Sequence, residues 1–245
     1  MNPTVLRPNA TGAYRFLSLI RAELSRGETL RGKRILDCGA GGPVPPLAIF
    51  AEQGMEALGI DISGGQLEAA RAFIDETELE IDLRRADMRE IPFSDGAFDY
   101  VYEHFSMCHL SKTDTARAIG EMRRVLKPGG IAFFGVVSTE SWPHSFYGEE
   151  RAVGERWMIE GGKEARHSLF TDEECARLVS SWEVLGKERA VFHHGGVDLT
   201  EETWADLRSE APGSFSAEEW AAAYARRADF CRYVHVYYCL REPSG

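Results

Sequence analysis

The stretch that decides the predicted fold is ILDCGAGG, from Ile35 to Gly42, in which a short apolar run passes into a glycine-rich turn. Such a run is typical of a buried strand. Pro45 and Pro46 follow, and proline suits the first turn of a helix because its missing N–H would be unpaired there. The stretch therefore predicts a strand, a tight turn and a helix.

A ligand can reach the main chain at this glycine turn. Backbone N–H groups at Gly39 and Gly41 are not covered by side chains, and the positive end of the next helix attracts an anionic or carboxylate-bearing ligand. Tight packing of the strand against the helix is the ordinary alternative for such a turn. The turn alone does not define a ligand site.

Outward from this turn, residues 34–138 alternate short apolar runs with helical patterns, which is typical of a parallel sheet covered by helices. Five strands are predicted: RILDC from Arg34, EALGID from Glu56, EIDLRRAD from Glu80, FDYVYE from Phe98 and GIAFFGVV from Gly130. Their apolar character on both faces suits the buried middle of such a sheet.

Helix signals fall around these strands. Residues 63–66 have the S-x-x-Q form of a capping box, and residues 171–174 are a second one. Apolar residues at helical spacing precede the Lys-Pro-Gly-Gly segment at 127–130, which ends that pattern. An amphipathic helix from Phe16 to Leu24 is expected over the sheet or the ligand cleft.

Two strand-like runs follow the core, one from Trp182 and one from Arg232. Residues 141–168 and 195–231 lie outside the alternating pattern and are interpreted as insertions. A chain of 245 residues with 44% hydrophobic residues can bury one sizeable core, so a single domain, 1–245, is expected.

Charge and composition exclude some partners. The chain has 28 Lys plus Arg against 39 Asp plus Glu, a net charge of -11, which disfavours binding to nucleic acid. The start lacks the apolar core of a signal peptide, and no run has the length of a membrane helix, so we expect a cytoplasmic protein without membrane contact. Five scattered cysteines have no metal or redox spacing.

Acidic residues follow two further strands. Asp61 ends the second strand, twenty residues after Gly41, where a carboxylate can accept both hydroxyls of a ribose. Asp87 with Met88 follows the third strand and can hold the amino group and the face of an adenine. Because ligands bind at the carboxyl ends of parallel strands, these residues are expected to share one crevice.

With these motifs the sequence resembles the class I S-adenosylmethionine-dependent methyltransferases that act on small molecules. The resemblance spans roughly residues 30–140 and is carried by ILDCGAGG, ALGIDIS, ADMREIPFSDGAFDYVY and EMRRVLKPGGIAFF. It implies an α/β fold with a Rossmann-like, seven-stranded, mostly parallel sheet, helices on both faces and an antiparallel C-terminal strand. It also implies a donor-binding core at 31–140, preceded by a helical segment at 1–30.

The resemblance implies a set of donor contacts. Asp37, Gly39, Ala40 and Gly41 would surround the methionine part of S-adenosylmethionine. One departure is that a proline-rich segment, 43–46, stands where the family often has a third glycine, which stiffens the loop.

Further along, the resemblance implies that Asp61 binds the ribose and Ile62 packs on the adenine. Asp87 and the Met88 backbone would recognise the polar edge of the adenine. Glu103 corresponds to the position that closes over the donor.

The acceptor would face the segment HFSMCHL after the fourth strand. His109 is the first candidate for a general base because histidine titrates near neutrality, although a histidine at a helix start can also cap or pack. The weaker candidates are His104, His144, Tyr147 and His167. The neighbouring His193 and His194 point to opposite faces of a strand, so no metal site is expected.

The two insertions are expected to form a lid over a small-molecule acceptor. Their aromatic residues could line its pocket, although packing explains most of them equally well: Trp142, Phe146, Tyr147, Trp157, Trp204, Trp220 and Tyr224. Two alternatives stay open, a nicotinamide-dependent oxidoreductase and a non-catalytic adenosylmethionine-binding regulator. The oligomeric state cannot be read from the sequence.

Overall fold

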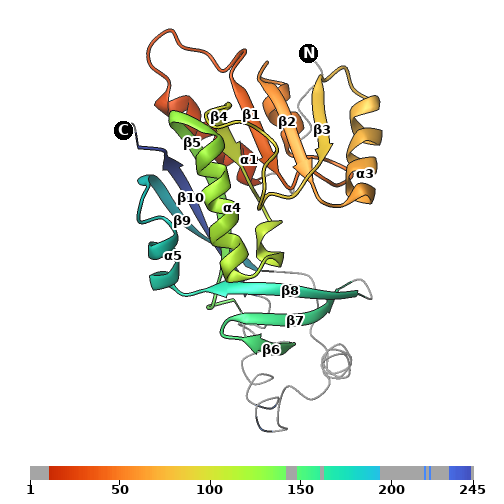
Figure 1. Cartoon of the computed structure of the whole chain (residues 1–245), viewed down its shortest axis with the longest axis vertical. Coiled ribbons are helices and arrows are strands. Elements are labelled where there is room, and N and C mark those ends of the chain that lie inside the picture. The colour runs from red at the N-terminus through yellow and green to blue at the C-terminus, as the bar shows by residue number, and fades with distance from the viewer. Residues whose placement is uncertain are drawn as a thin grey trace.

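A computed structural model describes residues 11–141, 148–160, 163–193 and 232–243, together with Glu218 and Ala221. Its ten strands form one connected sheet, and seven of them make up a central part with helices on both faces (Figure 1). The strand order is β3-β2-β1-β4-β5-β10-β9. The strands are β1 (Arg34–Cys38), β2 (Glu56–Asp61), β3 (Ile81–Arg85), β4 (Phe98–Tyr102), β5 (Leu126–Ser138), β9 (Glu183–His193) and β10 (Arg232–Arg241).

Strand directions confirm the predicted fold class. The pairs β1–β2, β2–β3, β1–β4 and β4–β5 are all parallel. In contrast, β10 is antiparallel to both β5 and β9. The sheet is therefore mostly parallel with an antiparallel C-terminal strand, as the resemblance implies.

The segment around 141–168 differs from the simple insertion expected for it. It contains β6 (Glu149–Ala152), β7 (Glu155–Glu160) and β8 (Lys163–Phe170), which pair in antiparallel fashion. The end of β8 joins β5 in parallel through Val137–Leu169 and Ser138–Phe170. This small sheet lies at the end to which β1–β3 point (Figure 1). The sequence missed it because strands with exposed, charged residues lack an apolar pattern.

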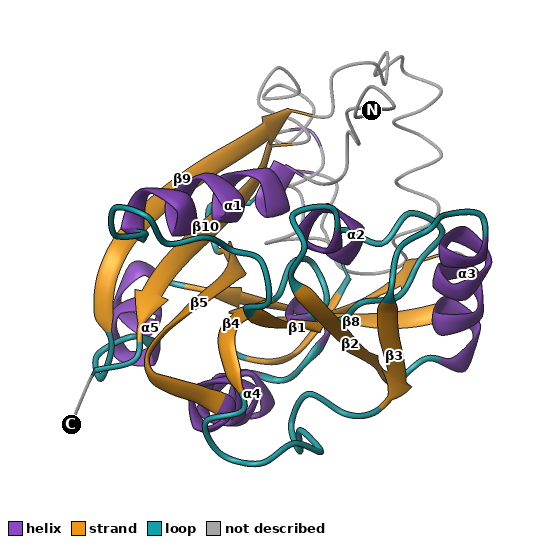
Figure 2. Ribbon diagram, turned by 90° about the horizontal axis from the view of Figure 1, so that it is seen from above, coloured by secondary structure: helices purple, strands orange, loops and turns teal. Residues whose placement is uncertain are grey.

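Alternation along the strands sends side chains into two apolar layers. Ile35 of β1 packs in one layer with α1 (Thr11–Glu23) and α2 (Leu47–Ala51), whereas its neighbour Leu36 packs in the other. The second layer contains α4 (Lys112–Val125) and α5 (Asp172–Leu178). Figure 2 shows α1 and α2 on the face of the sheet opposite α4. Helices on both faces bury the apolar strands, as expected.

Two helix starts explain how the chain turns away from the sheet. Thr171 and Glu174 form the full capping box that the sequence predicts at the start of α5. At α3 (Gly64–Asp75) the box is only half formed: Ser63 accepts from the Gln66 N–H, but its own N–H donates to Asp61 Oδ1 at 2.8 Å. The helix cap is thus tied to the end of β2.

Within the described ranges, no helix is both long and apolar enough to cross a membrane. The cytoplasmic location stays a prediction.

Candidate functional site

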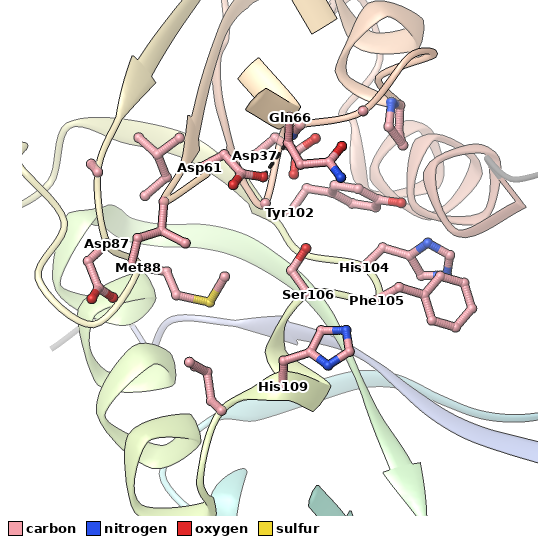
Figure 3. A pocket seen from close by; sticks show the side chains of 18 of the residues that line it. Asp37, Asp61, Gln66, Asp87, Met88, Tyr102, His104, Phe105, Ser106 and His109 are labelled. Carbon is pink, nitrogen blue, oxygen red and sulfur yellow. Dashed lines mark hydrogen bonds between the residues drawn. The ribbon is translucent and has the colours of Figure 1, made fainter. Parts of the chain in front are cut away.

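A cavity of about 790 Å³ opens at the carboxyl ends of β1, β2 and β4. Its walls come from the turn after β1, the start of α3, the segment after β3 and the segment after β4 (Figure 3). Gly39, Asp61 and Asp87 all line it. The three strand ends that the sequence predicted to converge therefore face one space.

The glycine turn needs residues without side chains. Gly39 has φ +114°, and a Cβ there would lie 2.1 Å from Ser106 Oγ. A Cβ at Gly41 would lie 2.5 Å from Gln66 Cβ and 2.6 Å from Asp61 Oδ2. Both positions therefore exclude a larger residue, and the main chain of the turn forms part of the cavity wall.

Asp61 is held by two backbone donors. Its Oδ2 accepts from the Gly41 N–H at 3.1 Å and its Oδ1 accepts from the Ser63 N–H at 2.8 Å. Each carboxylate oxygen has a second lone pair, so both oxygens keep acceptor capacity toward the cavity. The carboxylate is thus oriented before any ligand binds.

Asp37 is a buried acid on the cavity wall, with an exposed fraction of 2%. Burial raises the pKa of its carboxyl well above the usual value, and the charges of Glu103 and Asp61 raise it further. Its Oδ2 finds no hydrogen-bond partner among the described residues. A buried acceptor of this kind fits a cationic or N–H-bearing ligand group, because leaving it unpaired is costly.

Asp87 and Met88 line the same cavity beyond β2 (Figure 3). Asp87 accepts two hydrogen bonds from the Arg89 side chain at its Oδ2, at 2.6 and 3.0 Å, and these hold the pKa of its carboxyl below the usual value. Arg89 also donates to Asp114 of α4 at 3.1 Å. Asp87 is therefore ionised and fixed in place by a residue that the sequence did not single out.

Ala40 and Glu103 occupy a different position from the other expected donor contacts. Both are fully buried, and neither is among the described residues that line the cavity. Glu103 Oε1 accepts from the N–H groups of Ser106 and Met107 at 2.8 and 2.7 Å. Burial raises the pKa of the Glu103 carboxyl to about 7, and these bonds oppose the rise. Glu103 lies behind the wall and fixes the turn that forms it.

His104 lies at the opposite end of the cavity from Asp87 (Figure 3). Its Nε2 hydrogen-bonds to the Tyr237 hydroxyl at 2.8 Å, and its ring lies 3.9 Å from the Phe105 ring between centroids. Burial lowers the pKa of His104 to about 3, helped by the nearby His235 and Arg15. His104 is therefore uncharged at neutral pH and forms an aromatic part of the cavity wall.

His109 is exposed and lines the cavity on the side of β8. It belongs to η2 (Met107–His109), a short 3-10 helix, and its Nδ1 lies 3.0 Å from the Arg166 carbonyl oxygen. Because a carbonyl can only accept, Nδ1 carries the hydrogen, which leaves the Nε2 lone pair available. This tautomer suits a proton acceptor or a metal ligand.

The remaining expectations fall into two groups. His144, Tyr147, His194 and the aromatic residues Trp142, Phe146, Trp204, Trp220 and Tyr224 have side chains outside the described residues. Trp157 of β7 is described, and its ring stacks with Arg151 and Arg166 rather than lining the cavity. His167 lies on β8 beside His109, with ring centroids 4.9 Å apart.

The sequence reasoning missed Gln66 and Tyr102 as wall residues, whereas Phe105 and Ser106 belong to the segment HFSMCHL that was expected to face the acceptor. Phe105 has φ +65°, which is unusual for a bulky residue and cannot be read from the sequence. The Ser106 hydroxyl lies 2.1 Å from the position that a Cβ on Gly39 would take. A wall built by residues after β4 depends on the turn that Glu103 holds.

The fold and this site resemble those of the class I S-adenosylmethionine-dependent methyltransferases. Residues 36–134 match the family model described as a methyltransferase domain.

Comparisons with individual proteins agree. A 24-methylenesterol C-methyltransferase 2 of Oryza sativa subsp. japonica is 38% identical over 104 residues, covering 41% of this chain and 28% of that protein. A demethylmenaquinone methyltransferase of Thermus thermophilus is 38% identical over 101 residues, covering 40% and 44%. The match thus spans less than half of either relative.

Among solved structures, a SAM-dependent methyltransferase from Methanosarcina mazei superposes with a TM-score of 0.65 at 15% identity, covering 93% of this chain and 98% of that one. At this identity the likeness shows the fold. That fold extends over almost the whole chain, beyond the segment matched by sequence.

Proposed function

We propose that this chain transfers the methyl group of S-adenosylmethionine to a small-molecule acceptor. The observation that carries the proposal is one cavity lined by a glycine turn, an oriented carboxylate and a buried acid whose Oδ2 has no hydrogen-bond partner among the described residues. The family match favours this reaction over the nicotinamide-dependent alternative.

The cavity residues fit the chemical groups of this donor. The Asp37 carboxylate suits the ammonium of the methionine part, with the main chain of Gly39 and Gly41 beside it. Asp61 suits the two ribose hydroxyls, because both of its oxygens are already aimed by backbone donors. Pre-aimed groups reduce the loss of conformational entropy on binding.

The adenine would lie between Ile62 and Met88. Ile62 is an apolar side chain with an exposed fraction of 60% on the cavity wall, which favours an apolar partner there. Asp87, held by Arg89, would accept from the amino group of the adenine. Ala40 and Glu103 would act from behind the wall, by packing the turn and by holding the N–H groups of Ser106 and Met107.

When bound, the donor supplies an electrophilic methyl group on a sulfonium. The protein then has to hold the acceptor in line with that group and exclude water. The walls at this end, His104, Phe105 and Leu110, are neutral and mostly apolar at neutral pH. They suit a small acceptor without a formal charge.

His109 would accept the proton of acceptors that must lose one. Its Nδ1–H is bound to the Arg166 carbonyl, so Nε2 is the nitrogen left to act as the base. His104 fits this role less well because its Nε2 is bonded to Tyr237 and its pKa is about 3. We assign His104 to the wall of the acceptor end.

A calorimetric titration tests the donor site. We expect S-adenosylhomocysteine to bind, and the variant Asp61→Ala to bind it about tenfold or more weakly, since it removes both ribose acceptors. Asp75→Ala, which changes an exposed acid at the end of α3, should bind normally. Unchanged affinity in Asp61→Ala, or binding of NAD in place of the adenosyl ligand, would contradict the proposal.

Turnover is tested separately by incubating the protein with S-adenosylmethionine and a panel of neutral small molecules. Formation of S-adenosylhomocysteine that depends on the acceptor supports the methyltransferase. Tight donor binding with no turnover on any acceptor would favour the non-catalytic regulator.

A further inference from the structure

Three metal-binding side chains meet beside the acceptor end of the cavity. Cys108 and His109 belong to η2, and His167 comes from β8, almost sixty residues later in the chain. One ligand atom from each, the Cys108 Sγ and a ring nitrogen of each histidine, lies within 4.8 Å of the other two. Within the described residues this is the group that has the composition of a transition-metal site.

The ligand types define the class of metal. One thiolate and two imidazoles are borderline-soft ligands, which suit Zn²⁺ and neighbouring divalent transition metals rather than Mg²⁺ or Ca²⁺. Three protein ligands with an open fourth position are typical of catalytic zinc sites, whereas structural sites use four. His109 lines the cavity, so the open position would face it.

Surrounding hydrogen bonds hold His109 as in known metal sites, whereas the Cys108 thiol donates to the Phe105 carbonyl at 3.2 Å and has to give up that bond to coordinate an ion. A metal-bound histidine usually donates its other ring N–H to a carbonyl or carboxylate, and His109 Nδ1 does so to Arg166. Ser168 donates its hydroxyl to the Leu110 carbonyl at 2.6 Å, which fastens β8 to the end of η2. The two elements that carry the ligands are therefore joined on both sides of His167.

The separations of the three ligand atoms and the exposure of their side chains are both compatible with a bound metal ion. Zinc ligands lie at about 2.0 to 2.3 Å from the metal, so their mutual separations are about 3.3 to 3.8 Å in a tetrahedral site. The three atoms need to approach by about 1 Å, and His109 is exposed and can rotate to do so. Cys108 and His167 are 6% and 5% exposed, so an ion would be shielded from water on the inner side.

We propose that Cys108, His109 and His167 bind a divalent transition-metal ion of the zinc class at the acceptor end of the cavity. Such binding goes beyond the proposed methyl transfer and does not depend on it. An acceptor hydroxyl or thiol coordinated at the open position would lose its proton to solvent more readily. If His109 Nε2 coordinates the metal, that nitrogen cannot also accept a proton. In the metal-bound protein the ion would therefore take the place of His109 as the group that promotes loss of the acceptor proton.

The test uses the full chain, freed of metal with a chelator and titrated with Zn²⁺ in a calorimeter and with Co²⁺ in an absorption spectrometer. We expect one ion per chain and a thiolate-to-cobalt charge-transfer band. Cys108→Ser should abolish that band, and His109→Ala and His167→Gln should weaken binding about tenfold or more, as even outer-shell changes commonly do.

Two controls keep the outcome clear. Cys175→Ser changes a buried thiol on α5, away from this group, and should bind both metals as the unchanged protein does. Because Cys108 and His167 are buried, thermal unfolding of each variant checks its fold, and the exposed His109→Ala remains informative in any case. Absence of binding, or binding unaffected in all three ligand variants, would overturn the proposal.

Binding of S-adenosylhomocysteine is measured in the same samples. If the adenosyl ligand binds and the metal does not, the metal site fails and the methyltransferase assignment stands. If the metal binds and the adenosyl ligand does not, the methyltransferase assignment fails and the metal site stands.

Discussion

The buried position of Asp37 lowers the stability of the folded chain and favours the binding of a cationic ligand group. Its carboxyl has a raised pKa in the folded chain, mainly because it is buried, so ionisation costs more in the folded state than in the unfolded one. This cost is absent below the ordinary pKa of about 3.9 and grows as pH rises above it. Attraction between the ionised Asp37 carboxylate and a cationic group of the ligand would offset this cost when the ligand binds.

We predict that Asp37→Asn unfolds at a higher temperature than the unchanged chain, and that the difference increases from pH 5 to pH 8. The amide cannot ionise, which removes the cost. The same variant should bind S-adenosylmethionine about tenfold or more weakly, because the ammonium loses its counter-charge. Thermal unfolding and calorimetry measure the two effects, and a variant that is less stable at both pH values would contradict the assignment.

A substitution at Gly41 tests whether the glycine turn shapes the donor site. Gly41→Ala would place a Cβ against Gln66 and the Asp61 carboxylate, so Asp61 must leave its backbone donors. We predict a loss of donor affinity of about tenfold or more, measured by calorimetry. Gly64→Ala is the matched control because nothing lies within 4 Å of its Cβ position. Equal affinities of the two variants would show that the turn does not shape the site.

At this scale the sequence indicated the residues whose chemistry follows from their place at a strand end. Gly39, Asp61 and Asp87 face one cavity because parallel strands end on one edge of a sheet. Arg89 was not indicated, because its role depends on an ion pair formed in the folded chain. The segment that contains Phe105 was indicated, but the unusual backbone angle of that residue was not. The grouping of His167 with Cys108 likewise needs the contact of β8 with η2.

Helix α1 is the element that closes one face of the sheet. Phe16 is completely buried and its ring contacts the rings of Phe50, Tyr102 and Phe133. A Cβ at Gly12, in the first turn of α1, would lie 2.8 Å from the His104 ring. The helix therefore covers the core and also supports the acceptor end of the cavity.

We predict that Phe16→Ala lowers the free energy of unfolding by about 3 to 5 kcal/mol, since it leaves a cavity in an aromatic layer. Ser18→Ala on the exposed side of the same helix should change it by less than about 0.5 kcal/mol. Chemical denaturation with urea measures both. A small effect in Phe16→Ala would mean that α1 is not part of the cooperative core.

Two histidines, His104 and His235, make the fold sensitive to acid. His235 of β10 packs flat on Tyr237, and burial lowers its pKa to about 4. His104 after β4 behaves in the same way, with a pKa of about 3. In the unfolded chain each histidine is protonated below about pH 6.5. In the folded chain His235 is protonated only below about pH 4, and His104 only below about pH 3. Their contribution to stability is therefore lost as pH falls through that window.

We predict that His235→Phe reduces the drop in melting temperature between about pH 7 and about pH 5. Asp37 and Glu103, whose pKa values are raised, act in the opposite direction, but they are present in both proteins and cancel in the comparison. An equal drop in the two proteins would show that His235 takes its proton in the folded state.

The elements of the core were predictable because each carries its own signal. The strands β1 and β2 coincide with the predicted runs, and the Thr171 capping box is formed as expected. The sheet of β6, β7 and β8 was not predictable, because its register comes from pairing between strands rich in polar and charged residues, such as Glu155–Ser168 and Arg156–His167. Such strands depend on their neighbours more than on their own pattern.

For the whole molecule, the sequence identified the fold because the strand order of a parallel sheet follows from alternating elements and short crossovers. It located the donor side of the cavity for the same reason. On the acceptor side the sequence indicated the N-terminal helix, the segment after β4 and residues 141–168. It did not indicate the contacts between them, because these segments are distant in the chain. Only the folded arrangement shows that the acceptor end is neutral and contains the Cys108, His109 and His167 group.

The most direct measurement of the central claim is a crystal structure of the chain with S-adenosylhomocysteine. We predict the ribose hydroxyls within hydrogen-bond distance of both Asp61 oxygens, the adenine between Ile62 and Met88, and the amino group at Asp37. Density for the ligand at any other place, with the cavity beside Gly39 and Asp61 free of it, would contradict the account.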